Sequence, residues 1–122
     1  MMHWLLLIGG AIVAVFIVRT LYVARPGITP EAGRAALKSG DAVLVDVREP
    51  SEWGGGTLRH AFLLSLSDLR GPRAKWQAFL AKHKGKQFLL YCASGARSGM
   101  AAAMLRREGH RAVNAGAMAR WQ

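Results

Sequence analysis

The chain has 122 residues, enough for one small domain, and a net charge of +10 at neutral pH. Cys92 is its single cysteine, which excludes an intrachain disulfide framework. The four histidines are scattered without metal-ligand spacing, so we expect no metal and no cofactor. The basic residues are spread along the chain without interleaved aromatic residues, so we expect no nucleic-acid partner. The charge fits solubility and proximity to an anionic membrane surface, with an anionic substrate as the alternative.

An apolar N-terminal segment contributes much of the 52% hydrophobic content. The uncharged run "WLLLIGGAIVAVFIV" covers residues 4–18, and "RTLYVA" extends it to residue 24. A helix over residues 4–24 would span about 31 Å, close to the roughly 30 Å of a bilayer hydrocarbon core. Arg19 would lie in its last turns and direct its charge to the headgroups. The pattern predicts a transmembrane anchor within residues 1–25, followed by one domain over residues 26–122.

The charges flanking this segment predict its orientation. Only His3 precedes the apolar run, whereas Arg19 and Arg25 follow it. The positive-inside rule therefore predicts a single-pass membrane protein with its C-terminal domain in the cytoplasm. A cleaved signal peptide, which would carry a positive segment first, and a buried core helix are the alternatives. The turn-rich stretch "ARPGITP", residues 24–30, is interpreted as a short linker that keeps the domain near the bilayer.

The rest of the chain alternates between helix and strand patterns. Thr29 and Pro30 predict the start of a short helix that ends near Gly40. The β-branched run "AVLVDVR" predicts a strand that is buried on both faces. Further strands are predicted at residues 61–66, 87–92 and 111–116, and helices at residues 67–83, interrupted early by Gly71-Pro72, and 97–108. This alternation predicts an α/β fold with a mostly parallel central sheet and helices on both faces.

Cys92 stands where a predicted strand meets a predicted helix. Ligands of open α/β sheets bind beyond the carboxyl ends of the strands. The small residues "ASGA" let backbone N–H groups converge there, and both Arg97 and the helix N-terminus favour an anion. Such surroundings lower the pKa of a cysteine, which predicts a nucleophilic thiolate. The alternative is that Cys92 is a small buried residue with a packing role alone.

Several segments, in family order over residues 28–121, resemble those of rhodanese domains. "CASGARS" resembles their active-site loop, Cys-x-x-Gly-x-Arg-Ser, and "LVDVREPSEW" resembles their Asp-Val-Arg-x-x-x-Glu-Phe/Tyr/Trp segment. "NAGAMARW" is similar to a terminal segment that ends in Gly-Gly-x-x-x-Trp, and "GTLRHA" stands where Gly-His-Ile-x-Gly-Ala is usual. Thr57, His60 and Ala117 replace the usual histidine, glycine and second terminal glycine.

The resemblance implies a rhodanese-like three-layer fold and a rhodanese-type thiosulfate sulfurtransferase. Cys92 would take a sulfane sulfur from a small anionic donor, hold it as a persulfide and pass it to a thiol or cyanide-like acceptor. Asp46 and Arg48 would support the site from the neighbouring strand end, with a purely structural ion pair or capping role as an equal alternative. Glu52 is interpreted as structural. The residues that would bind the donor are Ala93, Ser94, Gly95, Ala96, Arg97 and Ser98.

Two other classes of function are weighed against the sulfurtransferase. Phosphatases with a related loop need five residues between the cysteine and the arginine, to surround a tetrahedral oxyanion. Only four residues separate Cys92 from Arg97. The main alternative is a membrane-tethered, non-catalytic binding or redox-sensing module, and the retention of Cys92 argues against it.

Overall fold

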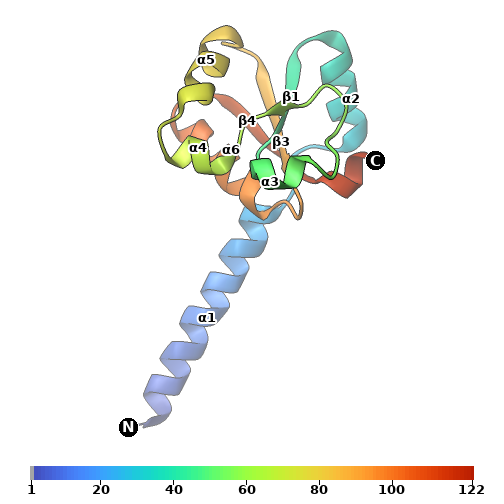
Figure 1. Cartoon of the computed structure of the whole chain (residues 1–122). Coiled ribbons are helices and arrows are strands. Elements are labelled where there is room, and N and C mark those ends of the chain that lie inside the picture. The colour runs from blue at the N-terminus through green and yellow to red at the C-terminus, as the bar shows by residue number, and fades with distance from the viewer. Residues whose placement is uncertain (1) are drawn as a thin grey trace.

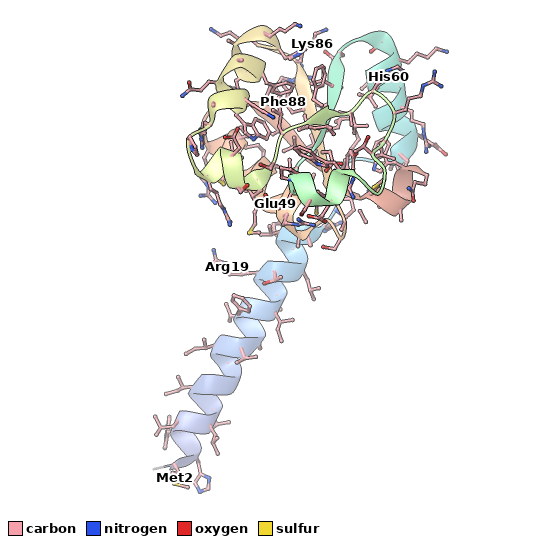
Figure 2. All side chains as sticks on the ribbon, viewed as in Figure 1. Met2, Arg19, Glu49, His60, Lys86 and Phe88 are labelled. Atoms are coloured by element: carbon pink, nitrogen blue, oxygen red, sulfur yellow. The ribbon has the colours of Figure 1, made fainter. Side chains whose placement is uncertain are left out.

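The computed structural model describes residues 2–122 and contains a long N-terminal helix that leads into an α/β domain (Figure 1). This helix, α1 (Met2–Ala24), has no buried residue and extends away from the domain. It is long and apolar enough to cross a membrane. Figure 2 shows Arg19 on the side of α1, a short way below the domain. The segment predicted as the anchor, residues 1–25, includes all of α1; Arg25 follows the helix, and residue 1 lies outside the described residues.

The domain is built on a four-stranded sheet in which all strands run parallel. The strand order is β2-β1-β3-β4. The strands are β1 (Ala42–Asp46), β2 (Phe62–Leu63), β3 (Gln87–Cys92) and β4 (Arg111–Ala117). The mostly parallel sheet predicted from the sequence is confirmed, but β2 is shorter than the predicted strand over residues 61–66. It ends early because Ser65 begins a helix, with its side chain accepting a hydrogen bond of 3.2 Å from the Asp68 amide.

Helices cover both faces of this sheet, as predicted (Figure 1). They are α2 (Pro30–Ser39), α3 (Pro50–Trp53), α4 (Leu66–Arg70), α5 (Ala74–Lys82), α6 (Ala96–Arg107) and the 3₁₀ helix η1 (Met118–Trp121). One apolar core lies between the sheet and α4, α5 and α6. A second core lies between the opposite face and α2 and η1. The result is a three-layer domain with the carboxyl ends of the strands at one edge.

Local sequence signals explain where the helices begin and end. Thr29 caps α2 by accepting a hydrogen bond of 3.1 Å from the Ala32 amide, and Gly40 ends it at a φ of 82°. The interruption predicted at Gly71-Pro72 separates α4 from α5. Helix α3 was not predicted because it has only four residues, although Pro50 and a capping box between Glu49 and Glu52 mark its start.

The contact between Gly33 and the Trp121 ring leaves no room for a side chain at position 33. Gly33 of α2 is buried under Trp121, and a Cβ at this position would overlap the indole ring. The Trp121 Nε1 atom donates a hydrogen bond of 2.9 Å to the Ala115 carbonyl oxygen. Gly33 therefore lets η1 close over the second core and fixes the C-terminal residues against α2.

We expect Gly33→Ala to destabilise the domain despite the better helix propensity of alanine. Overpacking against Trp121 should lower the free energy of unfolding by about 1–3 kcal/mol. Urea denaturation followed by tryptophan fluorescence measures this change. Gly54→Ala is the matched control, because a Cβ there meets no atom within 4 Å, and it should change the free energy by no more than about 0.5 kcal/mol. An unchanged or higher stability of Gly33→Ala would contradict this account of the packing.

Candidate active site

Cys92 is the last residue of β3. The loop that follows β3 lies at the end of the domain nearest to α1 (Figure 1). Residues 93–95 form a turn, and α6 begins at Ala96, one residue earlier than predicted. Cys92 is fully buried, whereas Ala93 and Ser94 in the turn are exposed. The structure thus gathers the predicted loop of residues 93–98 around the sulfur, with its exposed side at Ala93 and Ser94.

Backbone amides of this loop point at the sulfur. The Cys92 Sγ atom accepts hydrogen bonds of 3.0 Å from the Gly95 amide and 3.4 Å from the Ser98 amide, and the Ser98 Oγ atom lies 3.4 Å away. Gly95 has a φ of 96°, a conformation that glycine adopts without strain. Burial raises the pKa of the Cys92 thiol, but the Ser98 hydroxyl and the amides of Ser98, Ser94 and Gly95 together bring the pKa below its usual value. The loop therefore favours the thiolate.

Arg97 is held by a carboxylate from the other side of the site. Its Nη1 and Nη2 atoms lie 2.5 and 2.9 Å from the Oε1 and Oε2 atoms of Glu52 in α3. This bidentate pair lowers the pKa of Glu52 to about 2, with the Arg97 hydrogen bond as the largest cause. The attraction of the Cys92 thiolate also contributes to the raised pKa of Arg97. Sequence reasoning treated Glu52 as structural and so missed its contact with Arg97, although the capping box was a signal for its position.

Asp46 and Arg48 form a buried ion pair at the end of the neighbouring strand, β1. The Arg48 Nη2 atom lies 2.8 Å from Asp46 Oδ2 and donates a second hydrogen bond of 2.7 Å to the Gly56 carbonyl oxygen. Its Nη1 atom donates to the Glu52 carbonyl oxygen at 3.4 Å. The pair therefore fixes the segment of residues 49–56, which presents the Glu52 carboxylate to Arg97. Asp46 and Arg48 therefore act on the site indirectly, by positioning this segment.

A surface pocket of about 420 Å³ lies beside the cysteine loop. Arg70 and Arg97 bring positive charge to it, and Glu49 brings one carboxylate. Its lining residues are Glu49, Leu66, Ser67, Arg70, Gly71, Arg97 and Met100. Among residues 2–122, no three histidine, cysteine or carboxylate side chains are arranged to hold a metal ion. The pocket can accept a small anion next to the cysteine loop.

Asn114 joins the site to the end of α1, a contact that sequence reasoning missed. Its Nδ2 atom lies within 3.3, 3.1 and 3.2 Å of the carbonyl oxygens of Val23, Ala24 and Arg25. The Gly27 amide donates to the Asn114 carbonyl oxygen at 2.8 Å. The stretch interpreted as a linker is therefore not a free tether at its start, because Asn114 fixes it to β4. The one signal was a polar residue within the otherwise small and apolar run "AVNAGA".

The pH profile of Cys92 alkylation tests the arrangement of charges. With iodoacetamide, the rate should rise to half its plateau at a lower pH than for a free thiol, because the thiolate is the reactive form. Arg97→Gln should raise this midpoint, since it removes a cation and leaves the Glu52 carboxylate. Glu52→Gln should lower it, since Arg97 then keeps an unneutralised charge. Shifts of the same sign for the two variants would contradict the assigned roles.

Comparison with known proteins agrees with this fold. A match to the Rhodanese-like domain family covers residues 29–122. The chain is 34% identical over 106 residues to the uncharacterized protein YqhL of Bacillus subtilis, covering 85% of this chain and 78% of that protein. The human single-domain sulfurtransferase TSTD1 has a similar structure, with a TM-score of 0.61 at 28% identity over 80% of this chain and 95% of that one. A Rhodopseudomonas palustris protein described as a possible tyrosine phosphatase gives a TM-score of 0.60 at 31% identity, covering 76% of each chain.

Proposed function

Because this chain belongs to the rhodanese-like domain family, we propose that it is a sulfurtransferase that carries a sulfane sulfur as a persulfide on Cys92. The observation that carries the proposal is the set of amide donors aimed at the Cys92 sulfur, from Gly95 at 3.0 Å and Ser98 at 3.4 Å. Amide dipoles that stabilise a thiolate also stabilise the anionic terminal sulfur of a persulfide. TSTD1, a sulfurtransferase by its description, lends support from a similar structure.

In the first half of the reaction, the Cys92 thiolate attacks the outer, sulfane sulfur of a small anionic donor such as thiosulfate. A new sulfur–sulfur bond forms at Cys92 while the sulfur–sulfur bond of the donor breaks, and sulfite leaves with the bonding electron pair. No base is needed, because the thiolate is already formed. Arg70 and Arg97 line the neighbouring pocket. Arg70 would attract the donor, and Arg97 would bind it in competition with Glu52.

In the second half, a thiol or cyanide-like acceptor attacks the outer sulfur of the persulfide. The bond between the two sulfur atoms breaks, and Cys92 is released as the thiolate that began the cycle. The amides of Gly95 and Ser98 stabilise the negative charge that forms on the Cys92 sulfur as it leaves, because they are already oriented toward Sγ. The two transfers balance without an external oxidant or reductant.

Intact mass spectrometry after incubation with thiosulfate tests the proposal. The protein should gain one sulfur atom, about 32 Da, as a persulfide. Cyanide should then remove this mass and release thiocyanate. Cys92→Ser is the matched control and should gain no mass. The absence of an adduct with thiosulfate and with other sulfane donors would overturn the proposal and favour a non-catalytic binding module.

The proposal places the domain at a membrane, with α1 as a single-pass anchor. Its length and apolar composition meet the requirement for a span, and none of its residues is buried in the domain. Arg19 and Arg25 flank its C-terminal side, which favours a cytoplasmic domain. The cysteine loop lies at the end of the domain nearest to α1 (Figure 1), so the active site would face the bilayer surface.

Carbonate extraction of cell membranes tests this location. The full-length protein should stay in the membrane pellet at high pH, as expected for a spanning helix. Protease added to sealed inverted vesicles should digest the domain, because it faces the cytoplasm. Release by carbonate would contradict the anchor, and a mature chain lacking its first residues would identify a cleaved signal peptide.

The phosphatase description of the Rhodopseudomonas palustris neighbour does not carry over well to this site. Four residues separate Cys92 from Arg97, and the Arg97 guanidinium is engaged by Glu52 in a bidentate ion pair. A phosphoryl oxyanion would have to compete with that carboxylate for the same donors. The smaller loop is better matched to a single transferred sulfur atom.

A further inference from the structure

The orientation of the Asn114 side chain is determined by the groups around it. Its Nδ2 atom faces carbonyl oxygens only: the three at the end of α1 and that of Gly95, at 3.0 Å. Its Oδ1 atom faces donors only: the Gly116 amide at 2.9 Å and the Ser98 hydroxyl at 2.7 Å. Rotating the amide by half a turn would set nitrogen against donors and oxygen against acceptors. The carbonyl groups of α1 therefore help to keep the Asn114 oxygen directed at Ser98.

Ser98 has one hydroxyl hydrogen and two acceptors within reach. Its Oγ atom lies 2.7 Å from Asn114 Oδ1 and 3.4 Å from the Cys92 sulfur. All three side chains are buried, so water is not available to supply a second donor. Because the two acceptors share one hydrogen, a stronger hydrogen bond to one of them weakens the hydrogen bond to the other. The shorter contact favours Asn114, although the thiolate can still receive part of the interaction.

We propose that Asn114 is a positioning residue of this site: its side-chain oxygen competes with the Cys92 sulfur for the Ser98 hydroxyl hydrogen, and the end of α1 holds it in that orientation. The inference deepens the proposed sulfurtransferase function and rests on it. A thiolate that accepts fewer hydrogen bonds is a stronger nucleophile, because nucleophilicity falls as a thiol becomes more acidic. The α1 helix thereby becomes part of the support of the reacting atom as well as a candidate anchor.

Two glycines allow α1 to lie this close to the cysteine loop. A Cβ on Gly99 of α6 would overlap the Val23 carbonyl group, and a Cβ on Gly95 would come within 2.9 Å of the Ala24 carbonyl oxygen. The same Cβ on Gly99 would also lie 3.1 Å from Asn114 Nδ2. At Gly99, one methyl group would therefore press on the end of α1 and on the Asn114 amide, while Cys92, Ser98 and Asn114 keep their identities.

A double-mutant cycle on the full-length protein in detergent tests the competition. Asn114→Leu should shift the alkylation midpoint of Cys92 about half to one pH unit lower, because Ser98 then donates fully to the sulfur. The plateau rate should fall about twofold, since the more acidic thiolate is the weaker nucleophile. Ser98→Ala should raise the midpoint, and adding Asn114→Leu to Ser98→Ala should change it no further. Loss of packing alone would not depend on Ser98 in this way.

Gly99→Ala tests the contribution of α1 and also replaces Asn114→Leu if that variant does not fold. It should shift the midpoint lower by a smaller amount, again only when Ser98 is present. Gly10→Ala is the matched control, because it makes the same change in α1 where a Cβ meets no atom within 4 Å, and it should leave the profile unchanged. The charged groups near the sulfur are Arg97 of α6, Glu52 of α3 and the Asp46–Arg48 pair after β1, and all of them are kept in these variants.

Either of two results would overturn the inference: a midpoint that rises or stays constant in Asn114→Leu, or an equal shift with and without Ser98. Both readouts use alkylation and do not need sulfur transfer. Failure of the proposed function would instead appear as the absence of a persulfide in protein whose alkylation profile behaves as expected. The two failures are therefore distinguishable in one set of samples.

Discussion

The parallel alignment of β1, β3 and β4 is the constraint on which the site depends. Because the carboxyl ends of parallel strands meet at one edge, Asp46 and Cys92 come together, and β4 places Asn114 opposite Leu90, two residues before Cys92. The pairing of β3 with β4 shifts register, from Leu90 opposite Asn114 to Tyr91 opposite Gly116. The extra residue, Ala115, offers its carbonyl oxygen to Arg120 and Trp121 at 2.8 and 2.9 Å. One irregularity thus joins the site to the C-terminal closure of the domain.

The charged side chains of the site form ion pairs, whereas the groups that contact the Cys92 sulfur are mainly uncharged dipoles. Asp46 neutralises Arg48, and Glu52 neutralises Arg97. The first pair joins β1 to the loop after it, and the second joins α3 to α6. Each pair therefore holds backbone segments in place in addition to neutralising charge. The groups hydrogen-bonded to Cys92 are uncharged: the amides of Gly95 and Ser98 and the Ser98 hydroxyl. Buried dipoles are screened less by salt than exposed charges, so this stabilisation should persist at physiological ionic strength.

The parts of the fold that were predictable from the sequence are those with a strong local signal. The apolar runs before Asp46 and Cys92 marked the two central strands, and Thr29, Gly40 and Gly71-Pro72 marked helix ends. The loop around Cys92 followed from its small residues and from Arg97. Helix α3 and η1 were missed because four residues carry too little periodicity.

The contacts that sequence reasoning missed all join segments far apart in the chain. The partner of Arg97 is Glu52, 45 residues away, and the partners of Asn114 at the end of α1 lie about 90 residues away. Neither contact has a spacing rule that a single sequence reveals. A buried polar residue in a strand signals that a partner exists, but the partner itself is known only when the sheet is assembled.

Helix α1 passes directly into its contact with Asn114, which links the rotation of the helix to the orientation of the domain. Each residue of an α-helix adds 1.5 Å of rise and about 100° of rotation. Inserting one residue between Arg19 and Val23 would therefore turn the whole domain by more than a quarter of a revolution relative to the apolar part of the helix. If α1 is the membrane anchor that we propose, its length and rotation would determine the height and direction of the cysteine loop relative to the bilayer.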